Sequence, residues 1–233
     1  MPYKVQSTTI LPKEFVPIIK ALKDIHSLHN KHQIWYLVGG STAIVAASGK
    51  YFKVLGDVDI VCDIKQQEVL HNELIKLGYK LINIPPDSIV NRIKKHYVKD
   101  KQIIDIAFGS FTRKGYEIKL PMLIPGILLV FSKAMIRPSI YVLSNTKFLG
   151  FSKEAQWFGL GRFIDTIDAM NDKASKRKSN LSLLDENLNK KVIEEIKQGD
   201  PGIYIRSIPI VTPNNSTLLF LTNWFIKFWN RFF

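Results

Sequence analysis

Two short runs of this sequence alternate acidic and apolar residues, and they restrict the chain to folds that contain a half-buried β-sheet. Residues 57–63 read DVDIVCD and residues 103–108 read IIDIAF. In a strand, residues i and i+2 point to the same face. Asp57 and Asp59 therefore share one face, and Val58 between them points to the other. We expect both runs to be strands, with the apolar face packed on a core.

The segments around these runs predict a mixture of helices and strands. Apolar residues recur at helical spacing in some segments, whereas others are short, apolar and β-prone. The predicted helices are 11–32, 41–48 and 65–77, and the predicted strands are 34–38, 57–63, 79–84, 92–99 and 102–108. The last two strands flank Asp100-Lys101, which predicts a hairpin turn.

The pattern changes after about residue 125, where strand signals decrease and helical apolar patterns dominate. We therefore expect an α+β protein with a small mixed β-sheet core and flanking helices over residues 1–125. A mainly helical domain that completes the site is expected over residues 126–200. Residues 201–233 are expected to form a connector and an aromatic, amphipathic C-terminal helix.

Composition limits the partners and the compartment. The chain has 233 residues with 33 Lys and Arg against 20 Asp and Glu, a net charge of +13. Such a basic protein suits a polyanionic partner, namely a nucleotide, RNA, DNA or an anionic membrane. Cys62 is the only cysteine, so an intrachain disulfide is excluded and a reducing cytoplasm is expected. No secretory signal or membrane-length apolar run is recognisable, so we expect a cytoplasmic protein, whether free or peripheral at a membrane.

The acidic residues of the two alternating runs predict a metal site. If the two strands are neighbours, Asp105 joins Asp57 and Asp59, and three carboxylates converge. Carboxylates held this close repel one another unless a cation lies between them. Such a trio can hold two Mg²⁺ ions, or Mn²⁺, in the arrangement used for in-line attack on a nucleoside triphosphate.

The turn Gly39-Gly40-Ser41, between a predicted strand and a predicted helix, suits phosphate binding. Glycine lets the backbone approach a phosphate closely, and the N–H groups at a helix N-terminus favour anions. Ser41 either adds a hydroxyl donor or caps the helix. Neither this turn nor the Asp57–Asp59 pair is specific alone, but their order with a later third carboxylate is much more specific.

This order resembles the polymerase-β-like nucleotidyltransferase superfamily over residues 34–170. Downstream, the sequence VLSNTKFLGFSKEAQWFGLGRFIDTID is similar to the second half of the AbiEii-like and MenT-like branch, which contains toxins and antibiotic transferases. In that branch an apolar helix carries a lysine and is followed by an R-x-x-D-x-x-D pattern. The matching positions here are Lys153, Arg162, Asp165 and Asp168.

The resemblance implies that the chain transfers NMP from an NTP to a hydroxyl or phosphate acceptor. It implies that Lys153 and Arg162 bind the nucleotide and that Asp165 supports catalysis, although Arg162 and Asp168 equally suit a surface ion-pair network. The basic charge favours tRNA or another RNA as acceptor. An antibiotic or other small molecule is the alternative acceptor, and a toxin role would imply a partner antitoxin. A catalytically silent protein that binds nucleic acid or a membrane is the alternative outside the enzyme class.

Three further features leave their roles open. Sixteen residues separate Gly40 from Asp57, an interval longer than is usual in relatives, and we expect a loop there. The basic residues before the Asp105 strand either receive an RNA backbone or form a solvated hairpin. They are Arg92, Lys94, Lys95, Lys99 and Lys101, with His96 and Tyr97 among them. The aromatic tail, residues 217–233, either packs on its own domain, dimerises, or binds a membrane surface.

Overall fold

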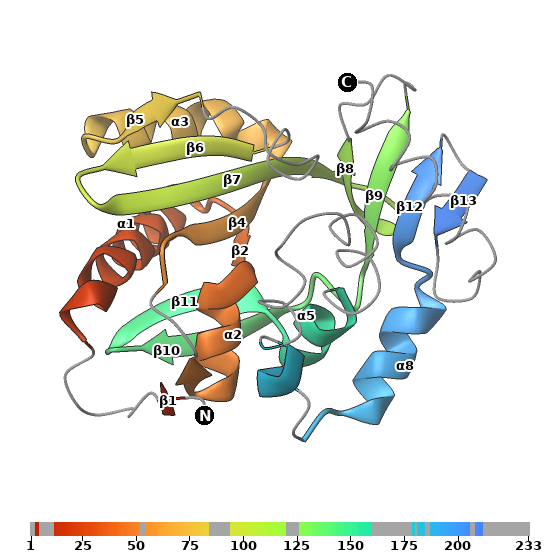
Figure 1. Cartoon of the computed structure of the whole chain (residues 1–233). Helices are drawn as coiled ribbons and strands as arrows, with labels where there is room; N and C mark the ends of the chain where they lie inside the picture. The colour runs from red at the N-terminus through yellow and green to blue at the C-terminus, as the bar shows by residue number, and fades with distance from the viewer. Residues whose placement is uncertain are drawn as a thin grey trace, which may run out of the picture. The chain divides into compact units, whose positions relative to one another are not determined.

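The structure is a computed structural model and describes most of the chain (Figure 1). The described residues are 3–4, 12–51, 55–83, 94–119, 126–159, 179, 181–184, 187–205 and 208–211. The chain divides into two compact units. The first comprises residues 1–85, 94–110 and 137–153, and the second comprises residues 86–93, 111–136 and 154–233.

The first unit is built on a mixed sheet with the strand order β10-β11-β2-β4-β7-β6-β5. Its strands are β2 (Tyr36–Val38), β4 (Val58–Asp63), β5 (Lys80–Ile82), β6 (Lys94–Lys99), β7 (Gln102–Phe111), β10 (Pro138–Leu143) and β11 (Thr146–Phe151). The central strands β4 and β7 are parallel, as are β11 and β2, whereas the other neighbours are antiparallel. The sheet order confirms that the two alternating runs of the sequence are adjacent strands.

Helices α1 (Val16–His32), α2 (Gly40–Ser48) and α3 (Gln67–Lys76) contribute to one hydrophobic core with this sheet. Helix α1 follows a 3-10 turn, η1 (Lys13–Phe15), and a second such turn, η2 (Ile64–Gln66), precedes α3. The apolar stripe of α1 is buried, as its helical spacing predicts. The core also contains the apolar face of β4, including Cys62, which is buried as a free thiol.

The long interval between Gly40 and Asp57 is only partly a loop. Helix α2 continues to Ser48, and β3 (Lys50–Tyr51) then pairs antiparallel with β1 (Tyr3–Lys4). Residues 52–54 lie outside the described residues.

The second unit contains a small antiparallel sheet of order β8-β9-β12-β13. Its strands are β8 (Gly115–Lys119), β9 (Ile127–Ser132), β12 (Gly202–Ile205) and β13 (Ile208–Val211), and its described helices include α8 (Lys190–Gln198). Helix α5 (Lys153–Gly159) begins at the end of the first unit. The prediction of mainly helical structure after residue 125 was therefore wrong for residues 127–151, which form β9, β10 and β11.

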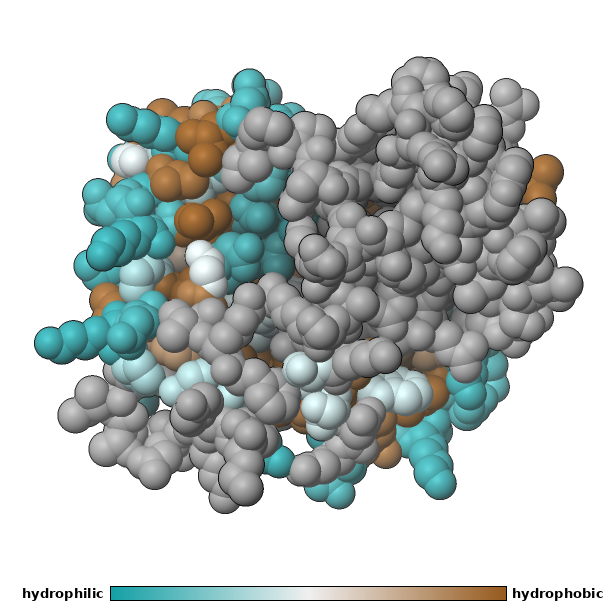
Figure 2. Space-filling model, in the orientation of Figure 1, coloured by the Kyte–Doolittle hydropathy of each residue, from teal (hydrophilic) through white to brown (hydrophobic). Residues whose placement is uncertain are grey.

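The surface drawn in Figure 2 mixes hydrophilic and hydrophobic patches over the elements labelled β5, β6 and β7 in Figure 1. Leu81 and Ile82 of β5 are exposed hydrophobic side chains. Among the described residues, no helix is long and apolar enough to span a membrane. The aromatic tail, residues 217–233, lies outside them.

Candidate active site

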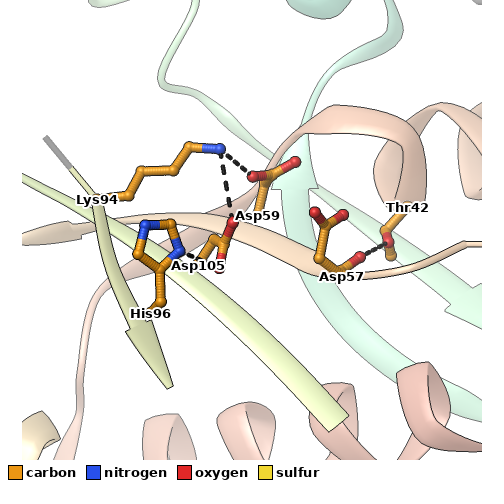
Figure 3. Close-up of polar contacts among 6 residues, drawn as sticks. All are labelled: Thr42, Asp57, Asp59, Lys94, His96 and Asp105. Carbon is orange, nitrogen blue, oxygen red and sulfur yellow. Dashed lines mark hydrogen bonds and ion pairs between the residues drawn. The ribbon is translucent and has the colours of Figure 1, made fainter. Parts of the chain in front are cut away.

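The parallel pair β4 and β7 brings the three predicted carboxylates together (Figure 3). Asp59 of β4 lies directly opposite Asp105 of β7, and Asp57 immediately precedes β4. One carboxylate oxygen from each residue lies within 4.8 Å of the other two. The convergence predicted from the sequence is thus present in the structure.

Two hydrogen bonds connect the start of α2 to residues 57–59, at the beginning of β4. The Gly39 N–H donates to the Asp59 carbonyl oxygen at 2.9 Å, and the Thr42 hydroxyl donates to the Asp57 carbonyl oxygen at 2.9 Å. Thr42 is 1 % exposed, so its hydroxyl needs this partner. The bonds place the N–H groups at the beginning of α2 beside the carboxylates.

Gly40 is required at this point for two independent reasons. Its φ of +59° is a left-handed conformation, which a residue with a Cβ adopts at a cost. A Cβ at Gly40 would also overlap the Asp59 carboxylate. The glycine therefore gives the Asp59 side chain the space that it occupies.

Strand β6 contributes two further polar side chains to the site. Lys94 and His96 are two residues apart and lie on the face of the sheet that carries Asp105. The Lys94 Nζ lies 2.5 Å from Oδ1 of Asp59 and 3.9 Å from Oδ2 of Asp105. His96 Nδ1 lies 2.8 Å from Oδ1 of Asp105, its partner in the strand register.

The charges at the site favour an ammonium ion on Lys94. Burial by itself lowers the pKa of Lys94, but the charge and hydrogen bond of Asp59 raise it, as do the charges of Asp105 and Asp57. The net result is a pKa above the ordinary value. Lys94 is therefore a cation within the acidic cluster at neutral pH.

His96 holds Asp105 in place. The ring is 4 % exposed, and its Nε2 is buried without a hydrogen-bond partner among the described residues. A carboxylate only accepts hydrogen bonds, so an ionised Asp105 requires that Nδ1 carry the hydrogen between them. This bond fixes the side chain of Asp105 and leaves its other oxygen, Oδ2, on the side of Lys94.

The donor set fits a divalent ion of the Mg²⁺ or Mn²⁺ kind. Three carboxylates supply hard oxygen ligands, which these ions prefer. The Lys94 ammonium already occupies part of this negative site as a cation of the chain itself. The residues that would hold ions are Asp57, Asp59 and Asp105.

Of the remaining predicted site residues, the structure describes two and leaves three outside the described residues. Ser41 lies in the first turn of α2, and Lys153 is the first residue of α5. Strands β2 and β11 are parallel with Val38 opposite Gly150, so the segments that follow them start from the same edge of the sheet. The Phe151 ring also lies against Gly39. Arg162, Asp165 and Asp168 lie outside the described residues.

Sequence reasoning did not assign Thr42, Lys94 or His96 to the site. Lys94 and His96 were grouped with a basic hairpin because of their neighbours. A signal for them existed in the predicted turn at Asp100-Lys101, because a two-residue turn pairs residue 99 with 102 and so residue 96 with 105.

The fold is similar to those of solved nucleotidyltransferase structures. Lincosamide antibiotic adenylyltransferase LnuA with lincomycin bound matches with a TM-score of 0.52 and 19% identity, over 72% of this chain and 97% of that chain. ANT(2'')-Ia in complex with adenylyl-2''-tobramycin matches with a TM-score of 0.54 and 17% identity, over 78% and 96%. This chain has a nucleotidyltransferase fold. A solution structure of ANT(2'')-Ia agrees, with a TM-score of 0.53 and 16% identity, over 77% and 88%.

This fold is the one that the resemblance in the sequence motifs implied, and the mixed sheet with flanking helices confirms the predicted fold class. No protein-family model and no curated protein matches the sequence. The likeness found by comparison is therefore one of fold.

Proposed function

We propose that this chain transfers NMP from an NTP to a hydroxyl group of a small-molecule acceptor. The observation that carries the proposal is the carboxylate triad on adjacent strands, set beside a glycine turn in a nucleotidyltransferase fold. The acceptor oxygen bonds to the α-phosphorus, the bond from that phosphorus to the bridging oxygen breaks, and pyrophosphate leaves with the electron pair.

The triad carries the chemistry in this proposal. Asp57, Asp59 and Asp105 would hold Mg²⁺, and the bound metal would supply neutralisation of the triphosphate charge and a lower pKa of the acceptor hydroxyl. Asp105 accepts the hydroxyl proton, because its Oδ2 is turned away from the His96 bond. His96 positions Asp105 for this transfer.

The phosphates are assigned to the edge of the sheet where β2 and β11 lead into α2 and α5. The N–H groups of Gly40 and Ser41, at the start of α2, suit the anionic charge there, whereas the Gly39 N–H already donates to the Asp59 carbonyl oxygen. Lys153 adds a positive charge from the start of α5. The resemblance further assigns Arg162 to the nucleotide and Asp165 to support of the catalytic residues.

A small acceptor is favoured over RNA by the structural neighbours. The LnuA structure contains lincomycin and the ANT(2'')-Ia structure contains adenylyl-2''-tobramycin, and each aligns with this chain over nearly its whole length. RNA remains the second candidate because the net charge is +13 and the β6–β7 hairpin carries Lys99 and Lys101 at its turn. An antitoxin partner and a role for residues 217–233 stay predictions.

The decisive experiment offers both acceptor classes to the purified chain. Each of the four NTPs, labelled at the α-phosphate, is incubated with MgCl₂ and with either a panel of lincosamides and aminoglycosides or total RNA. The wild type is compared with Asp59→Asn and with Asp63→Asn. Asp63 lies on the same strand, and its side chain accepts a hydrogen bond from Lys65 N at 3.1 Å, a bond that asparagine also makes.

We expect wild type and Asp63→Asn to label a small molecule. Asp59→Asn should lower kcat/KM at least about 10³-fold, because several kcal/mol of charge stabilisation are lost. If RNA became labelled and the small molecules did not, the acceptor would be RNA and not a small molecule. Failure of the wild type to bind any NTP in the presence of Mg²⁺ would refute the enzymatic function.

A further inference from the structure

The Lys94 ammonium lies beside the Asp59 and Asp105 carboxylates, two of the three groups that would hold a divalent ion. Its Nζ lies 2.5 Å from Oδ1 of Asp59 and 3.9 Å from Oδ2 of Asp105. Figure 3 shows the lysine side chain extending from β6 to the two carboxylates. The ammonium and a divalent ion held by these carboxylates would compete for the same negative charge.

This ion pair differs from a surface pair in its surroundings. The side chain of Lys94 is 17% exposed, and those of Asp59 and Asp105 are 26% and 10% exposed. Charges that are partly buried are screened less by water and salt than exposed ones. The ammonium therefore offsets a substantial part of the repulsion among the three carboxylates.

We propose that Lys94 is an internal counter-ion, which a divalent cation must displace in order to bind the triad. The proposal rests on the proposed function only in that the triad binds a divalent ion. The lysine stabilises the triad before the ion arrives and lowers the affinity of the triad for that ion. Ion binding is thereby coupled to a movement of the Lys94 side chain.

Removal of the Lys94 charge should strengthen ion binding. An opposite charge within hydrogen-bonding distance commonly changes the proton affinity of a carboxylate by one to three pKa units. We expect a similar scale for a competing metal ion, so Lys94→Gln should bind Mn²⁺ at least about tenfold more tightly than wild type. Mn²⁺ should also raise the Tm of Lys94→Gln more than that of wild type.

Lys95 provides a matched control on the same strand. Its Nζ lies 5.8 Å from the centre of the Phe108 ring, and its position in β6 places it on the opposite face from Lys94. Lys95→Gln removes the same charge from the chain without altering the triad. A general effect of net charge would appear in both variants, whereas a displaced counter-ion would appear only in Lys94→Gln.

The test measures Mn²⁺ binding by electron paramagnetic resonance, without nucleotide, for the full-length wild type, Lys94→Gln, Lys95→Gln and Asp59→Asn. Tighter binding by Lys94→Gln alone, together with loss of binding in Asp59→Asn, is the expected result. Equal or weaker binding by Lys94→Gln would overturn the counter-ion role and leave the proposed function to the transfer assay. Absence of Mn²⁺ binding in all four proteins would overturn both the counter-ion role and the two-ion site.

A second measurement covers the case in which Lys94→Gln does not fold. Side-chain nitrogen NMR of wild-type lysines follows the Lys94 ammonium, assigned by its disappearance in Lys94→Arg, during a titration with Mg²⁺. Its resonance should move as the ion binds. A resonance that stays constant while Asp59 responds to the ion would overturn the proposal.

Discussion

The two faces of the β4–β7 strand pair differ sharply although they alternate along the same residues. One face carries Val58, Ile60, Ile104 and Ile106, each at most 3% exposed and part of the main core. The other face carries Asp59 and Asp105 together with the lysine and histidine of β6. The apolar face stabilises the fold, whereas the polar face brings like-charged carboxylates close together.

The same small sheet supports a site whose carboxylate repulsion is unfavourable for folding. Burial of apolar side chains is the main favourable term in folding, whereas close carboxylates repel one another. Because both sets of residues lie on the same two strands, the core fixes the spacing of the carboxylates. Lys94 and His96 then reduce the cost of that spacing. Substitutions on the two faces should therefore affect different properties of the protein.

The largest effect on stability is expected from Ile106→Ala on the apolar face. Ile106 is fully buried, and loss of a buried isoleucine side chain costs roughly 2–5 kcal/mol of unfolding free energy. Ile103→Ala is the matched control, because Ile103 is on the same strand, faces the other way and is only partly buried. Urea denaturation of both variants measures the difference. A cost for Ile103→Ala as large as that for Ile106→Ala would contradict the division between the faces.

The assignment of residues to the two faces could be predicted largely from the alternation of the sequence alone. The runs DVDIVCD and IIDIAF specify which residues share a face, and the Gly39-Gly40 turn specifies where a helix can approach them. Adjacency of the two strands, however, depends on contacts that are distant in sequence. It came from the resemblance of the motif order to nucleotidyltransferases and not from local pattern.

Other parts of the fold and site were not predicted, for identifiable physical reasons. Residues 127–132 are apolar without strict alternation, so their pattern did not distinguish a strand from a helix. The segment 138–143 alternates, but its outward residues Ile140 and Val142 are exposed apolar side chains, which obscured the signal. The basic cluster around Lys94 predicts a surface position for this lysine, because the sequence does not reveal how deeply a lysine in such a cluster is buried.

A smaller effect that links the two faces is expected from Gly40→Ala. The left-handed φ alone costs a residue with a Cβ roughly 1–2 kcal/mol. Gly49→Ala isolates this term, because Gly49 has a φ of +66° but nothing within 4 Å of its Cβ position. Gly40→Ala should be less stable than Gly49→Ala and should also lose Mn²⁺ affinity, because its Cβ displaces the Asp59 carboxylate.

Thermal unfolding and Mn²⁺ binding together test the role of Gly40. If the two glycine variants had equal stability and both bound Mn²⁺ as well as wild type, the close approach of Gly40 to Asp59 would not control the position of the Asp59 carboxylate. A loss of Mn²⁺ affinity in Gly49→Ala would point instead to a general effect on α2.

The smallest effect concerns Cys62, whose thiol lies on the apolar face of β4. Burial, with a smaller contribution from the Asp63 charge, raises the pKa of Cys62 to about 12. A pKa raised by folding means that the neutral thiol is favoured in the native state. The stabilisation is therefore complete below the ordinary thiol pKa and is lost as the pH rises toward 12. At pH 8 the native protein should not react with iodoacetamide, whereas the urea-unfolded protein should.

The pH dependence of Cys62 can be separated from all other titrations by comparison with Cys62→Ala. The difference in unfolding free energy between wild type and this variant should be constant up to about pH 8.5. Above that pH it should shift against the wild type by up to about 1.4 kcal/mol per pH unit, because one proton is lost only from the unfolded chain. A flat difference from pH 7 to pH 11, or rapid alkylation of the native protein at pH 8, would mean that the apolar face of β4 is open to water. In that case the core could not fix the spacing of Asp57 and Asp59 on the opposite face.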